Sequence, residues 1–535
     1  MANAKKTPSK DVETAKKTSS AKKTAPKKAV KDVEEVVKEE NVERELEFES
    51  TIQDDNFSKF KSMKIGNFTL KHLLIGIVCV VLAILLIRGV ANSFSKESKV
   101  PDYGVVYTND DGDLMVVGAN GKKPVKLAND SSNDVQYANT TERFILFTKD
   151  DNLYLYDKKK GEDTTKIDKD VSSFGFSDDD KYIYYVNDED ELYTYKKESK
   201  KIDSDVTYVV GTIDNNIVYS KDDELYFRNM NGKKDKVKVA SDVKNQALSE
   251  DCSKILYQTD DDDLYIYKVS SKKATKIASD VSEVLDVTED LDKIIYSDND
   301  DDVYYVKGTK ATKIVSEVNI LDVDANEQQF VYEKDDELFY QKGTKKAVKI
   351  DDAEDVKSAY IFNGNEVYYT VRNDDKYELN YSKVGSKASS PKTVMDDVYS
   401  YVYTYYDKGL IAFSNVESYV GELNIIKGGK ATKVADDVKT TSINPNHKGN
   451  KLYFLGDYDS KDNSGALMST TGKKAKTLVE DVKDYDYVKD NIIYVSTGYS
   501  TKSGKFDLNV YNGRKLIKIA DSVRSVNAPY VNTKK

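Results

Sequence analysis

Short apolar segments recur along most of this chain, and polar turns rich in Asp, Asn, Lys and Gly separate them. The stretch Lys272–Gly308 shows the unit, with TKIAS, VSEVLDV, KIIYS and DVYYV as four segments of strand length. Aliphatic residues and Tyr occupy both alternating sets of positions, as in Leu264-Tyr265-Ile266-Tyr267. Such alternation is typical of a sheet that is packed on both faces. The pattern predicts four short β-strands per unit.

Two independent markers show that this unit is repeated. The steps between copies of the first marker run from 35 to 44 residues and average about 39. The first marker is an acidic residue followed by Val, found at Asp134, Asp170, Asp205, Asp242, Asp280, Glu317, Asp355, Asp397, Asp437 and Asp481, with Ser522 as a weaker eleventh copy. The second marker is the Leu or Val of a Leu-Tyr strand, at Leu114, Leu153, Leu192, Leu225, Leu264, Val303, Leu338, Leu379, Leu423, Leu467 and Leu508.

Four strands in about 39 residues is the size of a β-propeller blade. The sequence therefore predicts an all-β fold of one or more propellers built from eleven such repeats. Strand-length segments and abundant β-branched residues exclude a helical solenoid. A β-solenoid is the structural alternative, although its coils are usually shorter and richer in Gly or Asn.

The two ends of the repeat array are complementary. The first copy starts with the strand at Tyr103–Thr108 and lacks the strand before it, whereas the last copy ends with that strand, Val523–Val531. Pairing the two would remove both exposed sheet edges, so we expect the ends of the array to meet. Eleven blades make a wide ring, and the steps lengthen after Val356. Two packed rings with a seam near 351–364 are therefore favoured slightly over one large ring.

One uniformly apolar run interrupts the otherwise polar N-terminal region. Leu73–Ile87 contains no polar side chain, and with its flanks at 70–91 it reaches the roughly 20 residues that cross a bilayer core. About seventy residues precede the run, which argues against a cleaved signal peptide. The sequence predicts a single transmembrane signal anchor. Lys residues before it and the basic N-terminal tail favour a cytoplasmic N-terminus and an extracytoplasmic C-terminal domain.

The remaining segments follow from composition. Residues 1–30 contain nine Lys and two acidic residues with no apolar face, so a disordered tail is expected, and it is a candidate for contact with anionic lipid. The predicted organisation is a disordered cytoplasmic tail (1–50), a juxtamembrane segment (51–69), the transmembrane helix (70–91), a linker (92–101) and the propeller domain (102–535).

Charge and cysteine content narrow the function classes. The 535 residues have a formal net charge of -11, which argues against nucleic acid as a partner of the repeat domain. Cys79 and Cys252 are the only cysteines, and Cys79 lies in the apolar run, so an intramolecular disulfide is not expected.

The unit Val171–Val206 resembles the TolB-type, WD40-like propeller repeat. Phe176–Asp180 matches the polar turn of that family, Tyr182–Val186 its aliphatic strand, and Leu192-Tyr193 the next strand. The turn lacks the family's usual Pro and Gly. The resemblance covers about Tyr103–Val531. It implies a propeller fold that often binds proteins, and it supplies no catalytic residues.

Few side chains suggest chemistry of their own. His447 is the only histidine outside the membrane region, and it lies in a polar turn, so neither a catalytic triad nor a zinc site is expected. Carboxylates gather in hairpin loops, and oxygen-rich loops suit Ca²⁺. Asp and Asn are also favoured in tight turns, so these residues are weak calcium candidates: Asp111, Asp113, Asp298, Asp300 and Asp302.

These observations predict a membrane-anchored, extracytoplasmic propeller that binds or scaffolds a protein, a peptide or an envelope polymer, with no catalytic residues and no cofactor. A sensor that signals through the cytoplasmic tail and a carboxylate-based glycan hydrolase or lyase are the alternatives. Because the repeats explain most Asp and Tyr residues, specificity is expected where the copies differ, in the insertions at Asn444–Gly465 and Thr497–Lys505.

Overall fold

The computed structural model describes residues 64–65, 68–69 and 104–529, except 130–133, 142, 162, 214, 252, 354, 374–375, 400–401 and 405–408. The chain divides into two compact units, Met1–Lys96 and Glu97–Lys535. In the first unit, β1 (Lys64–Ile65) pairs antiparallel with β2 (Phe68–Thr69). The predicted tail (1–50) and transmembrane helix (70–91) lie outside the described residues. Within the described ranges, no helix has the length and apolarity needed to cross a bilayer.

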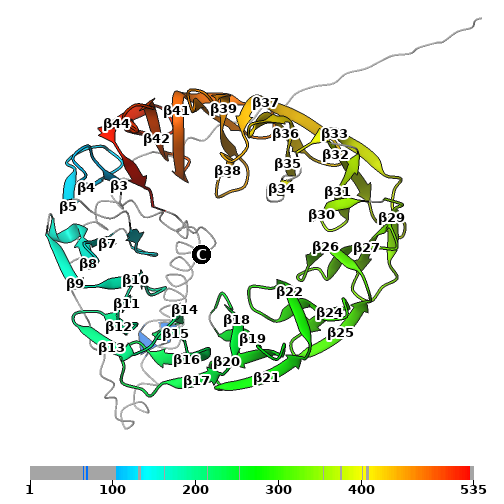
Figure 1. Ribbon diagram of the computed structural model, residues 1–535, viewed down its shortest axis with the longest axis horizontal. Coiled ribbons are helices and arrows are strands. Elements are labelled where there is room, and N and C mark those ends of the chain that lie inside the picture. Colours follow the sequence, from blue (N-terminus) through cyan, green and yellow to red (C-terminus); the bar gives the residue numbers. More distant parts are fainter. Residues whose placement is uncertain are drawn as a thin grey trace, which may run out of the picture. The chain divides into compact units, whose positions relative to one another are not determined.

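The second unit is a propeller-like ring of eleven antiparallel blades, each with its first strand nearest the centre and its fourth strand outermost (Figure 1). Blades 1 to 4 consist of β45 (Ser525–Asn527), β3 (Val105–Thr108), β4 (Leu114–Val117), β5 (Val125–Ala128); β6 (Val135–Tyr137), β7 (Phe144–Lys149), β8 (Asn152–Asp157), β9 (Thr164–Asp168); β10 (Val171–Phe176), β11 (Ile183–Asn187), β12 (Leu192–Tyr195), β13 (Ser199–Asp203); β14 (Tyr208–Ile213), β15 (Asn216–Lys221), β16 (Glu224–Asn229) and β17 (Val237–Ala240). A short 3-10 turn, Lys158–Lys160, follows β8.

Blades 5 to 7 repeat the same order with little change. Their strands are β18 (Val243–Leu248), β19 (Lys254–Thr259), β20 (Leu264–Lys268), β21 (Lys273–Ala278); β22 (Val281–Val287), β23 (Lys293–Asp298), β24 (Val303–Lys307), β25 (Lys310–Val315); β26 (Asn319–Asp324), β27 (Gln329–Lys334), β28 (Glu337–Lys342) and β29 (Val348–Asp351).

Blades 8 to 11 have longer second and third strands. Their strands are β30 (Val356–Phe362), β31 (Glu366–Asn373), β32 (Lys376–Lys383), β33 (Lys392–Val398); β34 (Tyr403–Thr404), β35 (Leu410–Glu417), β36 (Val420–Ile426), β37 (Ala431–Lys439); β38 (Asn444–Pro445), β39 (Leu452–Asp459), β40 (Ser464–Thr470), β41 (Lys476–Lys489); and, after β41, β42 (Ile492–Ser500), β43 (Lys505–Tyr511) and β44 (Leu516–Val523). The 14-residue β41 serves as the fourth strand of blade 10 and the first strand of blade 11.

Both sequence markers have a structural cause. The acidic residue of the first marker turns the chain from the fourth strand of one blade to the first strand of the next. It has a φ of 47–58° at Asp170, Asp205, Asp242, Asp280, Glu317, Asp355, Asp437 and Asp481, and so does Ser522. Asp and Asn are among the non-glycine residues that best tolerate this left-handed conformation. The Leu or Val of the second marker is at most 1% exposed in all eleven copies, where it packs between blades.

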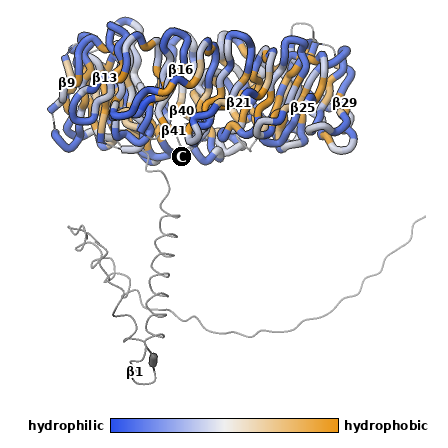
Figure 2. Tube along the Cα trace, turned by 90° about the horizontal axis from the view of Figure 1, so that it is seen from below, coloured by the Kyte–Doolittle hydropathy of each residue, from blue (hydrophilic) through white to orange (hydrophobic). Residues whose placement is uncertain are grey.

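The blades form one closed circuit. Buried clusters join each blade to the next, and Val105 and Tyr107 of blade 1 pack with Tyr494 and Leu508 of blade 11. Figure 2 shows the apolar residues of the ring between two polar rims. A blade cannot cover its own faces, so its stability depends on both neighbours.

The expected seam near 351–364 is not present, because Val331 and Leu338 of blade 7 share a core with Val367 and Tyr369 of blade 8. The expectation of two rings is therefore wrong. The repeats lengthen after Val356 because the hairpins of blades 8 to 11 are taller.

The expected meeting of the two ends is confirmed. β45 pairs antiparallel with β3, and Thr108 lies opposite Ser525. Tyr137 of blade 2 fastens this closure, because its hydroxyl accepts a hydrogen bond from Val106 N at 3.0 Å and donates one to Asn527 O at 2.6 Å.

Lysine and tyrosine, two abundant residues of this chain, make contacts that recur from blade to blade. In eight blades a fourth-strand Lys forms an ion pair with an acidic residue just before the third strand or within its first three residues: Lys126–Asp113, Lys201–Glu191, Lys238–Glu224, Lys276–Asp263, Lys313–Asp302, Lys349–Glu337, Lys433–Glu422 and Lys518–Asp507. Lys along an outer edge strand also discourages edge-to-edge association. Tyr pairs stack across the second and third strands, as Tyr257 and Tyr265 do at 5.2 Å.

We predict that Tyr137→Phe destabilises the ring by about 1–3 kcal/mol, because it leaves Val106 N and Asn527 O of the closure without this partner. Urea unfolding measures the loss, and hydrogen exchange should rise first in β3. Tyr154→Phe is the matched control in the same blade, since Tyr154 contributes a stacked ring against Phe147. Equal losses for the two variants would show that the hydroxyl of Tyr137 does not hold the closure.

Candidate functional site

The ring has two unlike faces, set by its antiparallel topology. One face carries the hairpins between second and third strands and the connections between blades, and we call it the hairpin face. The opposite face carries the turns between first and second strands and between third and fourth strands, and we call it the turn face.

The structure places the calcium candidates on the hairpin face, but in blades 1 and 6, so it does not bring the two groups together. Asp111 and Asp113 lie in the β3–β4 hairpin, where Asp113 N donates to Asn109 Oδ1 at 2.9 Å. The carboxylate of Asp113 forms an ion pair with Lys126 at 2.7 Å. These residues shape and brace their turn.

The β23–β24 hairpin shows the same use of carboxylates. Asp298 Oδ1 accepts hydrogen bonds from the backbone N–H groups of Asp300 and Asp302, at 3.0 and 2.9 Å. The carboxylate of Asp302 pairs with Lys313. Across the described ranges, no group of three or more His, Cys, Asp and Glu side chains is arranged to hold a metal ion. In both hairpins the contacts of these carboxylates are hydrogen bonds within the turn and ion pairs with a Lys of the same blade.

His447 also has a structural environment. It lies in the β38–β39 turn, its Nε2 is 2.7 Å from Val488 O, and its ring is 5.1 Å from that of Tyr487. The contact ties blade 10 to the first strand of blade 11.

The strongest candidate for a binding site is a cleft on the hairpin face between the tall hairpins of blades 9 and 10. It has a volume of about 750 Å³, and the β35–β36 and β39–β40 hairpins form its walls. Sequence analysis identified the insertion at Asn444–Gly465, which supplies the β39–β40 wall. It missed the β35–β36 wall, whose only signal was the longer spacing of the repeats.

Charge in this cleft is only partly compensated. Lys433 bridges Glu422 and Asp436, at 2.9 and 2.5 Å. Four further carboxylates form no ion pair with another residue that the structure describes: Glu417, Asp437, Asp457 and Asp459. Their negative potential favours ligand groups that donate hydrogen bonds or carry positive charge.

The tip of the β35–β36 hairpin breaks the rule that the other tips follow. Two-residue tips elsewhere are Asp-Asp, as at Asp222-Asp223, and both residues have positive φ. Here the pair is Ser418-Tyr419, with φ of 50° and 65°, and the side chain of Tyr419 is 66% exposed. A bulky residue in this conformation costs about 1–2 kcal/mol. Strain without a compensating buried contact is characteristic of functional positions.

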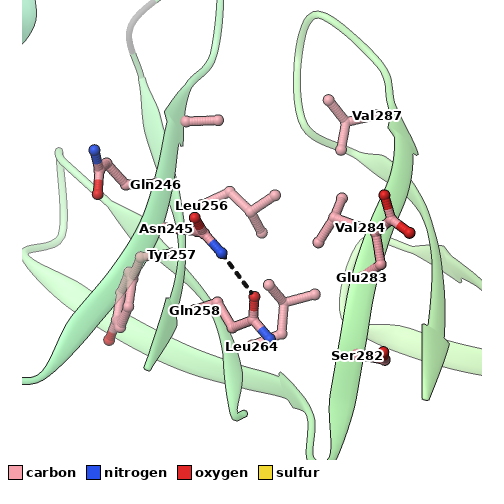
Figure 3. Close-up of a pocket in the computed structure, with 11 residues that line it drawn as sticks. Asn245, Gln246, Leu256, Tyr257, Gln258, Leu264, Ser282, Glu283, Val284 and Val287 are labelled. Carbon is pink, nitrogen blue, oxygen red and sulfur yellow. Dashed lines mark hydrogen bonds between the residues drawn. The ribbon is translucent and has the colours of Figure 1, made fainter. Parts of the chain in front are cut away.

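A second cavity lies between the inner strands of blades 5 and 6 (Figure 3). It measures about 310 Å³, with Leu256 and Val284 on facing walls and Asn245 donating to Gln258 Oε1 at 3.3 Å. A 410 Å³ cavity occupies the corresponding place between blades 2 and 3, where Thr148 replaces Gln258. Because the feature recurs, it reflects the joint between blades more than an individual site.

Carboxylates also form hydrogen bonds between the inner strands of adjacent blades. Asp286 Oδ2 accepts from Ala325 N of the next blade at 2.7 Å, and Asp322 Oδ2 accepts from Ile361 N at 2.6 Å. Burial, together with the nearby Asp324 and Asp286, raises the pKa of Asp322 to about 6, despite the hydrogen bonds that oppose this shift.

Comparison with known proteins does not identify a family. No protein-family model matches the sequence, and no curated protein does. Among solved structures, a eukaryotic initiation factor has 10% identity over 79% of this chain and 97% of its own, with a TM-score of 0.37. PorZ, a surface component of the type-IX secretion system of Porphyromonas gingivalis, is 11% identical in sequence, and the match covers 71% of this chain and 58% of PorZ, with a TM-score of 0.23. Hsv2 of Kluyveromyces lactis is 9% identical in sequence, and the match covers 48% of this chain and 95% of Hsv2, with a TM-score of 0.26. At such low TM-scores these likenesses carry no conclusion about this chain.

The raised pKa of Asp322 predicts a pH-dependent stability. The folded chain binds this proton more tightly than the unfolded chain, so the unfolding free energy should fall as pH rises from about 4 to about 6. The full pKa shift of Asp322 corresponds to a change of about 3 kcal/mol in the free energy of unfolding. Because Asp322 is partly exposed, solvent screening reduces the expected change to about 1–2 kcal/mol. Asp322→Asn should make this slope shallower in denaturant unfolding at several pH values.

Part of the slope should remain in that variant, because burial and Asp484 also raise the pKa of Asp486 to about 6. The same substitution at an exposed turn residue, Asp150→Asn, is the control for the chemical change itself. An unchanged slope in Asp322→Asn would contradict the role given to Asp322.

Proposed function

We propose that this chain is a single-pass membrane protein that presents its ring outside the cytoplasm as a binding or scaffolding module for a protein, a peptide or a cell-envelope polymer. The anchor in this proposal is the apolar segment 70–91, and the cytoplasmic part is the tail 1–50. The ligand contacts the hairpin face at the cleft between blades 9 and 10.

The single observation that carries the binding role is the strained, exposed tip Ser418-Tyr419 beside that cleft. In the first seven blades the corresponding hairpins are short and rich in Asp, as turn geometry requires. The hairpins of blades 9 and 10 are both taller and form the two walls of one cleft, and the tip of blade 9 also lacks Asp. Tyr supplies a large contact area with few rotatable bonds, which is why it is enriched at binding surfaces.

A comparison of two glycine substitutions tests this role. Tyr419→Gly removes the ring and relieves the left-handed strain, so we expect a stability equal to or up to about 1 kcal/mol above that of the wild type. The same variant should lose its ligand. Asp223→Gly changes the same position of the blade 4 tip and should keep the ligand.

Proximity labelling from a peroxidase fused to the C-terminus of the full chain, in the cells from which the sequence comes, measures ligand contact. We expect one set of extracytoplasmic neighbours with the wild type and with Asp223→Gly, and its loss with Tyr419→Gly. Neighbours unaffected by Tyr419→Gly would refute the cleft as the binding site. Exclusively cytosolic neighbours would refute the membrane topology.

A further inference from the structure

Lysine is distributed unequally between the two faces of the ring. The turns between third and fourth strands lie on the turn face at its outer perimeter (Figure 1). Each of these eleven turns contains Lys or Arg or is flanked by it directly. The hairpins of blades 1 to 7, on the opposite face, each contain at least two acidic residues. The ring therefore has acidic hairpins on one face and a basic perimeter on the other, a separation that the net charge of the chain, -11, does not show.

Lys and Arg occur all round this perimeter, and acidic residues of the turn face offset them least in one sector, from blade 8 through blade 11 to blade 1. We call it the basic sector, and its exposed cations are Lys383, Lys387, Lys427, Lys430, Lys473, Lys474, Arg514, Lys515, Lys122 and Lys123. None of them forms an ion pair with another described residue, in contrast to the paired Lys residues of the fourth strands. Leu516, one of three large hydrophobic side chains described as exposed, is 39% exposed next to Arg514 and Lys515.

Acidic residues on the turn face lie elsewhere. Most occupy the turns between first and second strands, nearer the centre of the ring, and they concentrate in blades 3 to 7, as with Asp178, Glu250 and Glu289. Others, such as Glu198 and Asp235, lie in the third-to-fourth turns of blades 3 and 4. Blade 10 has Lys448 and Lys451 in its turn between first and second strands. Asp490 of blade 11 lies close to Lys451, at 3.9 Å. The ten cations of the basic sector form no ion pair with it, whereas the rest of the turn face is mixed.

The chain enters the ring on this same face. Gly104 precedes β3, and the start of a second strand lies at the turn face in blade 1, inside the basic sector. Twelve residues separate it from the end of the proposed anchor at Ala91. Fully extended, they span at most about 40 Å. In an anchored ring the tether and the basic sector would therefore be on the same face.

We propose that the basic sector docks on the anionic lipid headgroups of the membrane that carries the anchor, so that the acidic hairpin face and its cleft point away from the bilayer. This inference rests on the proposed membrane anchor. Each Lys or Arg near an anionic surface contributes about 1 kcal/mol, and the attraction decays within about 10 Å at 0.1 M salt. The tether removes most of the entropy cost of association, so a modest attraction is sufficient. Leu516 adds a small apolar contact at the headgroup level.

The full chain in lipid nanodiscs tests the docking. Acylation rates of individual lysines, read by mass spectrometry, are compared between discs of phosphatidylcholine and discs containing phosphatidylglycerol. We expect Lys122, Lys473 and Lys474 to react at least about threefold more slowly in the anionic discs, and high salt should abolish the difference. Lys461 and Lys502, in hairpins of the opposite face, are internal controls that should not change.

Two di-lysine turns supply matched variants. Lys473→Glu with Lys474→Glu alters blade 10 in the basic sector, and it should release the protection of Lys122. Lys345→Glu with Lys346→Glu makes the same change in the corresponding turn of blade 7, outside the sector, and it should leave that protection in place. Equal effects of the two pairs would refute a localised docking sector.

The remaining outcomes separate this inference from the anchor itself. A chain that enters the discs but shows the same acylation rates in both lipids refutes docking and leaves the anchor intact. Protection by a soluble polyanion such as RNA, without an effect of lipid, also refutes it. A chain that does not enter the discs refutes the anchor, and the same labelling with anionic vesicles added to the soluble chain then decides whether the basic sector binds lipid.

Discussion

The packing of each sheet against its two neighbours is the interaction on which this ring depends. A blade of four short strands has apolar side chains on both faces, and it has no helix to cover them. The invariant Leu or Val of the third strand is buried in every blade because it lies at this joint. A chain of such blades has two unpaired ends unless it closes, and closure here pairs the last strand of the chain with the first strand of the array. Tyr137, which belongs to neither strand, links them.

Closed packing restricts where the chain can vary. The inner and middle strands are fixed by their neighbours, so differences among the blades appear at the turns and hairpins. In blades 1 to 7 the hairpins remain short, and their Asp residues shape turns and pair with Lys. In blades 8 to 11 the second and third strands rise further, and a cleft opens between two of them. The strained Tyr419 lies at the edge of this cleft, where a turn-forming residue would cost less.

The antiparallel order of strands also sorts charge. Because second-to-third and third-to-fourth connections emerge on opposite faces, an Asp-rich sequence in one and a Lys-rich sequence in the other give the ring acidic hairpins on one face and a basic perimeter on the other. The same rule puts the entry of the chain on the basic side. In our proposals the hairpin face receives the ligand and the turn face receives the membrane, so one topological feature serves both.

The sequence by itself determined the strand content, the eleven repeats, their boundaries and the pairing of the two ends, because each depends on local patterns repeated many times. It also indicated that Asp298 and its neighbours are turn residues, since turn chemistry is local. Only the tertiary structure decided the number of rings, because blade-to-blade packing across 351–364 depends on contacts between Val331, Val367 and their neighbours that no local pattern specifies. The cleft also needed the structure: its two walls come from segments about 40 residues apart, and their approach depends on the angle between blades. The raised pKa of Asp322 has the same origin, because burial between adjacent inner strands is a property of the assembled ring.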